Sequence, residues 1–213
     1  MGKPGIEDQL LYDESDTAAY GGQFAKAREL TRRAAESAVR ADEKEAAASY
    51  EAEAAVREAL VGNMALAKQQ AQAAIAHSNG RDVTGPSAIA LALAGDTAHA
   101  TRLADDLSKR LPEDTIVQFA YLPVLRAEAS LRDGNSRTAM EALAAAAPYE
   151  LGARGSVAIW LRGEVYLVER QGREAAVEFQ NVPMRSPATL LRLAPPTKIS
   201  LHSGKTPTPT SPF

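Results

Sequence analysis

The stretch GQFAKARELTRRA, residues 22–34, decides the fold because similar phrases recur four more times along the chain. The other copies are GNMALAKQQAQAA from Gly62, GDTAHATRLADDL from Gly95, GNSRTAMEALAAA from Gly134 and GREAAVEFQ from Gly172. The first glycines of successive copies lie 40, 33, 39 and 38 residues apart. Intervals of this size accommodate one helical hairpin per copy. The sequence therefore predicts about five antiparallel helix hairpins.

The remainder of the chain also has a helical composition. Ala accounts for 43 of the 213 residues, and Ala has the highest intrinsic helix propensity. From about Gln9 to Gln180 the apolar residues recur at helical spacing, with short breaks at Gly, Asn or Pro and no convincing strand. We therefore expect an all-α fold, in which residues 1–180 form one array of helical repeats.

Each recurring residue of the phrase has a physical role. Gly adopts the left-handed conformation that ends a first helix, and a small residue five positions later permits close crossing of two helices. That residue is Ala27, Ala67, Ala100 or Ala139 in the first four copies and Val177 in the fifth. A single hairpin cannot bury its apolar stripe alone, so we expect neighbouring hairpins to stack.

The predicted first helix of the fifth copy, AIWLRGEVYLVERQG at residues 158–172, contains Trp160, Leu161, Gly163 and Tyr166. These residues resemble the Trp, Leu, Gly and Tyr pattern of the tetratricopeptide repeat (TPR) family. The resemblance implies a superhelical solenoid of stacked hairpins that binds a protein or peptide. It also implies that Gly163 and Tyr166 are packing residues of the repeat.

A closer resemblance covers about residues 2–180. Phrases similar to GKPGIED, YGGQFAKAREL, LALALAGDTAHATRLADDL, VLRAEASLRDGNSRTAMEAL and RGEVYLVERQG occur in the carboxyl-terminal repeats of large acidobacterial-type serine/threonine protein kinases and winged-helix regulators. In such proteins a catalytic or DNA-binding domain precedes the repeats. The resemblance implies that the chain is a detached sensory or docking portion of such a protein. The alternative is a free-standing interaction scaffold.

A solenoid places its first helices along a concave groove that can hold a peptide. Projection of the fourth and fifth hairpins predicts that Tyr121, Glu128, Arg132, Trp160 and Glu164 lie near this groove. Tyr and Trp are favourable binding anchors, and the two Glu residues favour a basic ligand. The alternative is that Tyr121 and Trp160 pack between hairpins.

The sequence contains no convergent set of catalytic residues. It has no glycine-rich loop on a strand, no V-A-I-K, no H-R-D-x-x-x-x-N and no D-F-G, which are the kinase signatures. With no Cys, and with His77, His99 and His202 on separate segments, it offers few metal ligands. We therefore expect neither catalysis nor a metal or cofactor.

Acidic side chains of the second hairpin are expected to have structural roles. Glu51, Glu53 and Glu58 share one predicted helix, where such residues are usually solvated helix formers. Asp42 and Glu45 have the spacing of a capping box that begins this helix.

Charge and hydropathy restrict the class of partner. The formal net charge of −3 does not favour nucleic acid, because a surface that follows phosphates is normally strongly basic. No apolar stretch approaches the roughly 18 to 20 residues that cross a bilayer. We expect a cytoplasmic protein with a protein or peptide partner.

The carboxyl-terminal segment differs from the array. Residues 181–213 contain seven of the twelve prolines, four basic residues and no acidic residue. The predicted net charge is +4 for this segment and −7 for residues 1–180. A Pro, Ser and Thr-rich composition cannot continue the helices, so we expect a disordered tail. A shifted reading frame or a recombined end accounts for this segment, or else it is a true flexible linker or a peptide ligand.

Overall fold

The computed structural model describes residues 6–150 and 156–182, and within these ranges it contains helices and turns but no strand. The predicted all-α fold class is therefore confirmed. The helices are α1 Glu7–Tyr20, α2 Phe24–Arg40, α3 Lys44–Leu60, α4 Met64–His77, α5 Arg81–Leu93, α6 Thr97–Arg110, the π-helical η1 Val117–Tyr121, α7 Leu122–Arg132, α8 Ser136–Ala144, the 3-10 turn η2 Ala147–Tyr149, α9 Ser156–Val168 and α10 Gly172–Asn181.

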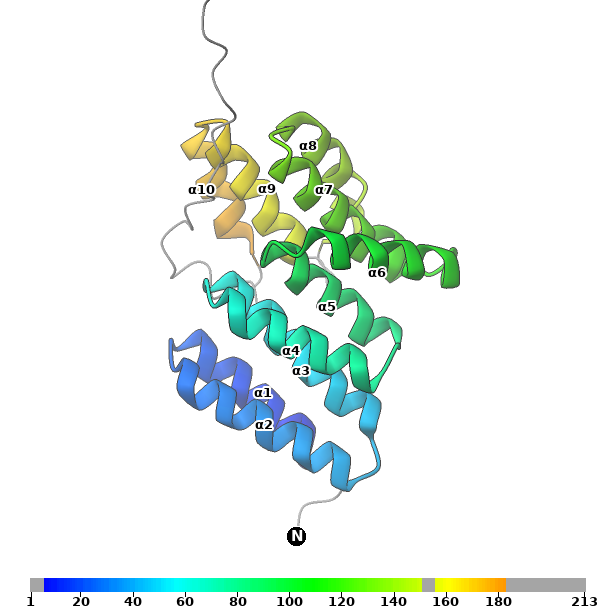
Figure 1. Cartoon of the computed structure of the whole chain (residues 1–213). Helices are drawn as coiled ribbons and strands as arrows, with labels where there is room; N and C mark the ends of the chain where they lie inside the picture. The colour runs from blue at the N-terminus through cyan, green and yellow to red at the C-terminus, as the bar shows by residue number, and fades with distance from the viewer. Residues whose placement is uncertain (1–5, 151–155, 183–213) are drawn as a thin grey trace, which may run out of the picture.

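Consecutive helices pair, and the pairs follow one another along the molecule (Figure 1). In chain order the pairs are α1 with α2, α3 with α4, α5 with α6, α7 with α8, and α9 with α10. The first helices also contact one another, α3 with α5, α5 with α7 and α7 with α9. Each inner pair is therefore covered by a neighbour on both sides.

The same turn joins the two helices of every pair. Gly22, Gly62, Gly95 and Gly134 all have positive φ, between 74° and 89°. In the first pair the N–H of Gln23 donates to the carbonyl of Ala18 at 2.8 Å. This bond spans five residues and is typical of the Schellman motif, in which a left-handed residue satisfies the last carbonyls of a helix.

The fifth turn is not where the sequence analysis placed it. Arg170 has φ of 59°, and the N–H of the next residue, Gln171, donates to the carbonyl of Tyr166 at 2.8 Å. Gly172 is instead the first residue of α10. The left-handed residue of the fifth pair is therefore an arginine, which a search for glycine cannot find.

This shift corrects the fifth packing position. Ala27, Ala67, Ala100 and Ala139 are all at most 3% exposed, but Val177 is 52% exposed. Five residues after the left-handed turn of the last pair lies Ala175, which is 1% exposed. Counted from Arg170, the fifth pair therefore also has a small residue five positions after its left-handed residue.

The capping box predicted at Asp42 is also wrong. Asp42 has φ of 63° and occupies a turn of the same kind between α2 and α3, where the N–H of Glu43 donates to the carbonyl of Ala38 at 2.9 Å. Glu43 is the residue that precedes α3, and its side chain makes no capping hydrogen bond. Asp tolerates the left-handed conformation better than most residues, which explains its position.

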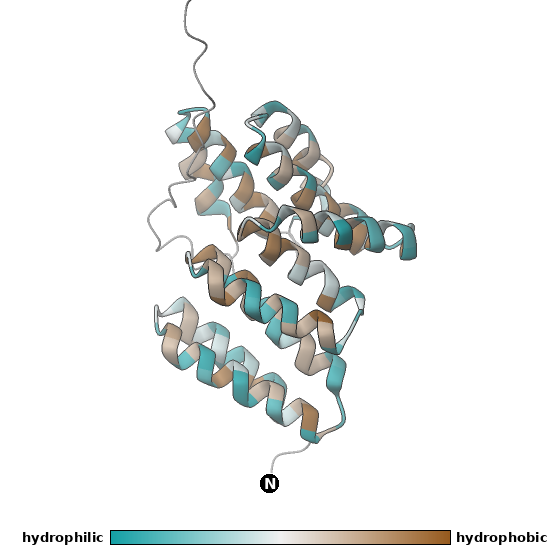
Figure 2. Ribbon diagram, in the orientation of Figure 1, coloured by the Kyte–Doolittle hydropathy of each residue, from teal (hydrophilic) through white to brown (hydrophobic). Residues whose placement is uncertain are grey.

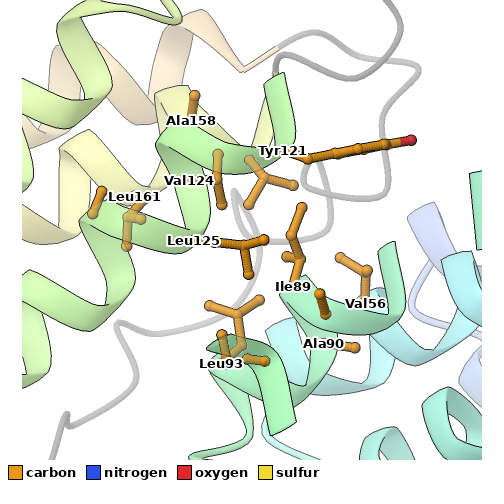
Figure 3. Packing of buried hydrophobic residues seen from close by; sticks show 14 of the residues in the cluster. Val56, Ile89, Ala90, Leu93, Tyr121, Val124, Leu125, Ala158 and Leu161 are labelled. Atoms are coloured by element: carbon orange, nitrogen blue, oxygen red, sulfur yellow. The ribbon is translucent and has the colours of Figure 1, made fainter. Parts of the chain in front are cut away.

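The apolar side chains form one large cluster, a smaller amino-terminal one and a third that contains Ala48, Ala52, Ala74 and Val83. Figure 2 shows hydrophobic residues recurring along every helix between hydrophilic ones. The larger cluster extends from α3 to α9, and Figure 3 shows side chains of α5, α7 and α9 meeting within it. A second cluster joins α1 and α2 to the first half of α3.

Ala67→Leu is expected to destabilise the fold by about 1 to 3 kcal/mol, because added methylene groups overpack a tight helix crossing. Ala67 is completely buried where α4 meets its neighbours. The control is Ala73→Leu, at an exposed position of the same helix. Urea denaturation followed by circular dichroism measures both free energies of unfolding, and equal values for the two variants would contradict the expected crossing at Ala67.

No helix in the described ranges is long and apolar enough to cross a membrane. Of the predicted tail, only Asn181 and Val182 are described, at the end of α10, and residues 183–213 lie outside the described residues.

Candidate interaction site

Tyr121, the first of the predicted groove residues, is packed between helices. Its side chain is 2% exposed, and its hydroxyl donates to Asp82 of α5 at 3.2 Å. The ring lies directly over Gly85, where an added Cβ would come within 2.3 Å of the ring carbons. Gly85 therefore allows η1 and α5 to approach closely (Figure 3).

Trp160, Gly163 and Tyr166 lie on α9. Trp160 is 7% exposed and belongs to the large hydrophobic cluster, whereas Tyr166 is half-buried. A Cβ at Gly163 would meet the ring of Phe179 of α10 at 2.5 Å, so the glycine provides space for that ring. The burial of Trp160 and Tyr121 favours the packing alternative over a role as exposed anchors.

The remaining predicted groove residues form one polar cluster between α7 and α9. Arg132 donates from Nε to Glu128 at 2.8 Å and from Nη2 to the carbonyl of Leu93 at 2.8 Å. Glu128 is 6% exposed and Glu164 is 3% exposed. Arg132 thus links α5 to α7, while Glu164 approaches the cluster from α9.

The two carboxyl groups repel each other. Burial is the main cause that raises the pKa of Glu164 to about 7, and the negative charge of Glu128 contributes to this shift in the same direction. Burial also raises the pKa of Glu128, although the Arg132 guanidinium opposes that shift. The cluster can therefore hold a proton near neutral pH, but its buried side chains offer little surface to a ligand.

An open groove lies away from this polar cluster. It is formed between the second helices α2 and α4, with α3 beneath them. We call it the α2–α4 groove; Figure 1 shows these helices side by side. Its volume is about 680 Å³. It is lined by Arg32, Ala35, Glu36, Val39, Arg40, Lys44, Ala47, Ala48, Glu51 and His77.

The middle of the α2–α4 groove is apolar. Ala35, Ala47 and Ala48 form part of its lining with their small side chains, and Val39 on the α2 wall is 54% exposed. Small residues leave the space that larger side chains would otherwise fill. The three alanines are each at most 8% exposed, so the uncovered apolar surface of the groove lies mainly at Val39.

The charged residues of the groove are unevenly placed. Arg40 ends α2, Lys44 begins α3 and His77 ends α4, so three basic side chains meet at one end of the groove. The ammonium of Lys44 lies 3.8 Å from Asp42, and both side chains are largely exposed. We call the residues Arg40, Lys44 and His77 the basic end.

The other charges lie further along the groove. Arg32 forms ion pairs with both Glu29 and Glu36 on its own helix, so one guanidinium is shared between two carboxylates. Burial raises the pKa of Glu51, and the charge of His77 opposes that shift. Within the described ranges, the buried Oε2 of Glu51 has no hydrogen-bond partner.

Three of the four acidic residues of α3 are less solvated than expected. Glu58 is 1% exposed and accepts two hydrogen bonds from Arg28, both at 2.8 Å, and a third from Asn63 at 2.7 Å. Glu51 and Glu53 are half-buried. The expectation fails because α3 is covered by α2, α4 and α5, which leaves these side chains buried or only partly exposed.

A second, smaller pocket of about 200 Å³ lies between α5, α6 and α7. Its charged lining residues are Asp105 and Arg126, and no group of three or more His, Asp or Glu residues able to hold a metal lies in the described parts of the chain. The α2–α4 groove is thus the larger of these two open sites and the more strongly charged.

Comparison with known proteins assigns neither a family nor a function to the chain. The chain matches no family model, no curated protein and no solved structure. The interpretation of the α2–α4 groove therefore depends on its geometry and chemistry.

Proposed function

We propose that this protein is a TPR-like helical solenoid that acts as a protein-protein interaction scaffold, without catalysis of its own. The observation that carries the proposal is the α2–α4 groove, whose apolar lining is left open between two helices. Apolar surface that neighbouring side chains leave uncovered is a common mark of a binding site, because a partner can remove it from water.

The repeated architecture supports the solenoid part of the proposal. Five helix pairs share one turn geometry and a buried Ala five residues after the left-handed residue. Repeats of this kind stack so that each pair contacts its neighbours, and they present extended surfaces suited to peptides. The Trp160, Leu161, Gly163 and Tyr166 pattern on α9 adds the resemblance to the TPR family.

The second candidate is a docking portion of a bacterial serine/threonine kinase or winged-helix regulator. It is favoured by the phrases that resemble the repeats of those proteins, such as VLRAEASLRDGNSRTAMEAL at residues 124–143. In that case the same groove would bind the regulator's partner, so both candidates assign binding to one surface.

A photocrosslinking residue at Val39 tests the proposed function. Val39 is exposed in the groove, and Val177 is similarly exposed on α10, away from the groove lining. We expect a specific crosslinked partner from the source cells at Val39 and none at Val177. The purified partner should then bind saturably, and Val39→Asp should weaken that binding about tenfold or more because it places a charge on apolar surface. Equal crosslinking at both positions would contradict the proposal.

A further inference from the structure

The basic end of the α2–α4 groove is a concentrated and accessible charge. Arg40 and Lys44 are exposed side chains, and His77 completes the group from the opposite wall. Because three helix ends meet there, His77 faces the same opening as Arg40 and Lys44, although it follows Lys44 by 33 residues in the sequence. A partner with carboxylates at this end would meet complementary charge.

Acidic residues in and beside the groove offset part of this charge, since the carboxylate of Asp42 lies 3.8 Å from the Lys44 ammonium. Glu36 pairs with Arg32, which Glu29 shares, so this part of the α2 wall adds no net positive charge to the groove. Glu51 lies on α3 towards the middle of the groove, where burial raises its pKa and the charge of His77 opposes that shift. The remaining positive charge is therefore confined to one end, next to apolar surface formed by Val39, Ala35 and Ala47.

We propose that the α2–α4 groove binds an acidic amphipathic segment of a protein partner, with apolar side chains on the alanines and Val39 and carboxylates at the basic end. This inference rests on the proposed scaffold function and specifies the chemistry of its partner. A small inorganic anion would satisfy the basic end but would leave the apolar lining uncovered. Two walls made of helices form the kind of groove that receives an amphipathic helix.

The probe is a short, fluorescently labelled helical peptide composed of Glu, Leu and Ala, compared with the same peptide carrying Lys in place of Glu. Fluorescence anisotropy measures binding of each peptide to the full chain at low and at high salt. We expect the acidic peptide to bind and the basic peptide not to bind. Affinity should fall at high salt, because exposed charges are screened.

The decisive variant combines Arg40→Glu with Lys44→Glu and is expected to weaken acidic-peptide binding by about tenfold or more. The matched control combines Lys26→Glu with Arg33→Glu, which changes the net charge equally at exposed positions of α2 outside the groove. The control should retain most of the affinity. Circular dichroism confirms that both variants keep the helix content of the parent.

The outcomes separate this inference from the proposed function. The proposal of an acidic partner is overturned if the acidic peptide does not bind. It is also overturned if both double variants weaken binding of that peptide equally. Stronger binding of the basic peptide also overturns it. If a partner still crosslinks specifically at Val39 in those cases, the scaffold function stands and only the partner's chemistry is wrong.

Discussion

The protein is expected to lose stability as the pH rises from about 4.5 to about 7, and Glu164→Gln should remove much of this loss. Burial and the nearby Glu128 raise the pKa of Glu164 to about 7, from an ordinary value of 4.5. Between these values the folded protein keeps the proton of Glu164 whereas the unfolded chain has lost it. The folded state therefore binds more protons, and its stability falls with increasing pH.

The expected size follows from the shift. One pKa unit corresponds to about 1.4 kcal/mol, so the ionised Glu164 costs up to about 3 kcal/mol at pH values above 7. The contribution is fully present below pH 4.5 and is lost as the pH passes 7. Gln cannot ionise, so the variant should be more stable than the parent at about pH 8 and nearly equal to it at about pH 4.5.

Urea denaturation at several pH values measures this difference. Glu169→Gln is the matched control, since Glu169 is exposed directly after α9 and should affect stability little. Other carboxyl groups contribute to the pH profile of every variant. The quantity to compare is therefore the difference in free energy of unfolding between Glu164→Gln and the control at each pH. A difference that does not change with pH would contradict the raised pKa of Glu164 beside Glu128.

Arg57→Ala is expected to destabilise the fold by about 3 to 5 kcal/mol, because it removes a buried partner and leaves polar groups uncompensated. Arg57 is 1% exposed. Its guanidinium donates to Asp16 of α1 and to Thr31 of α2, both at 2.8 Å. It therefore connects α3 to both helices of the preceding pair.

A double-mutant cycle with Asp16→Asn tests this connection. Burial raises the pKa of Asp16 even beside Arg57, so an unpaired carboxylate there is costly. Once Arg57 is absent, Asp16→Asn should recover part of the lost free energy of unfolding. Arg33→Ala, at an exposed position of α2, should change stability by less than about 0.5 kcal/mol. Strictly additive effects of the two substitutions would contradict the pairing.

The sequence predicted the turns wherever their left-handed residue is glycine. Gly22, Gly62, Gly95 and Gly134 have the positive φ that the repeated phrase indicated. The same turn at Asp42 and Arg170 could not be found in this way, because those residues adopt the conformation only when the helices on both sides enforce it. Tertiary structure thus determined two turns that local propensity does not favour.

The candidate site was less accessible to sequence analysis. The α2–α4 groove joins Val39 and Arg40 to His77, and their proximity depends on the spacing between two helices that no local pattern encodes. The sequence placed Glu128 and Glu164 separately near a concave surface. Their buried approach to each other follows from the contact between α7 and α9, which depends on how the two pairs stack.

The division of the hydrophobic side chains into separate clusters has a consequence for the groove. One wall, α2, belongs to the amino-terminal cluster, whereas Ala67 and Ala71 of the other wall, α4, belong to the larger cluster. Local opening of the amino-terminal cluster would dismantle the groove and leave the larger cluster intact. Backbone amides of α1 and α2 should therefore exchange with deuterium faster than those of α5 and α7. An occupant of the groove should slow exchange even in α1, which lines no part of it.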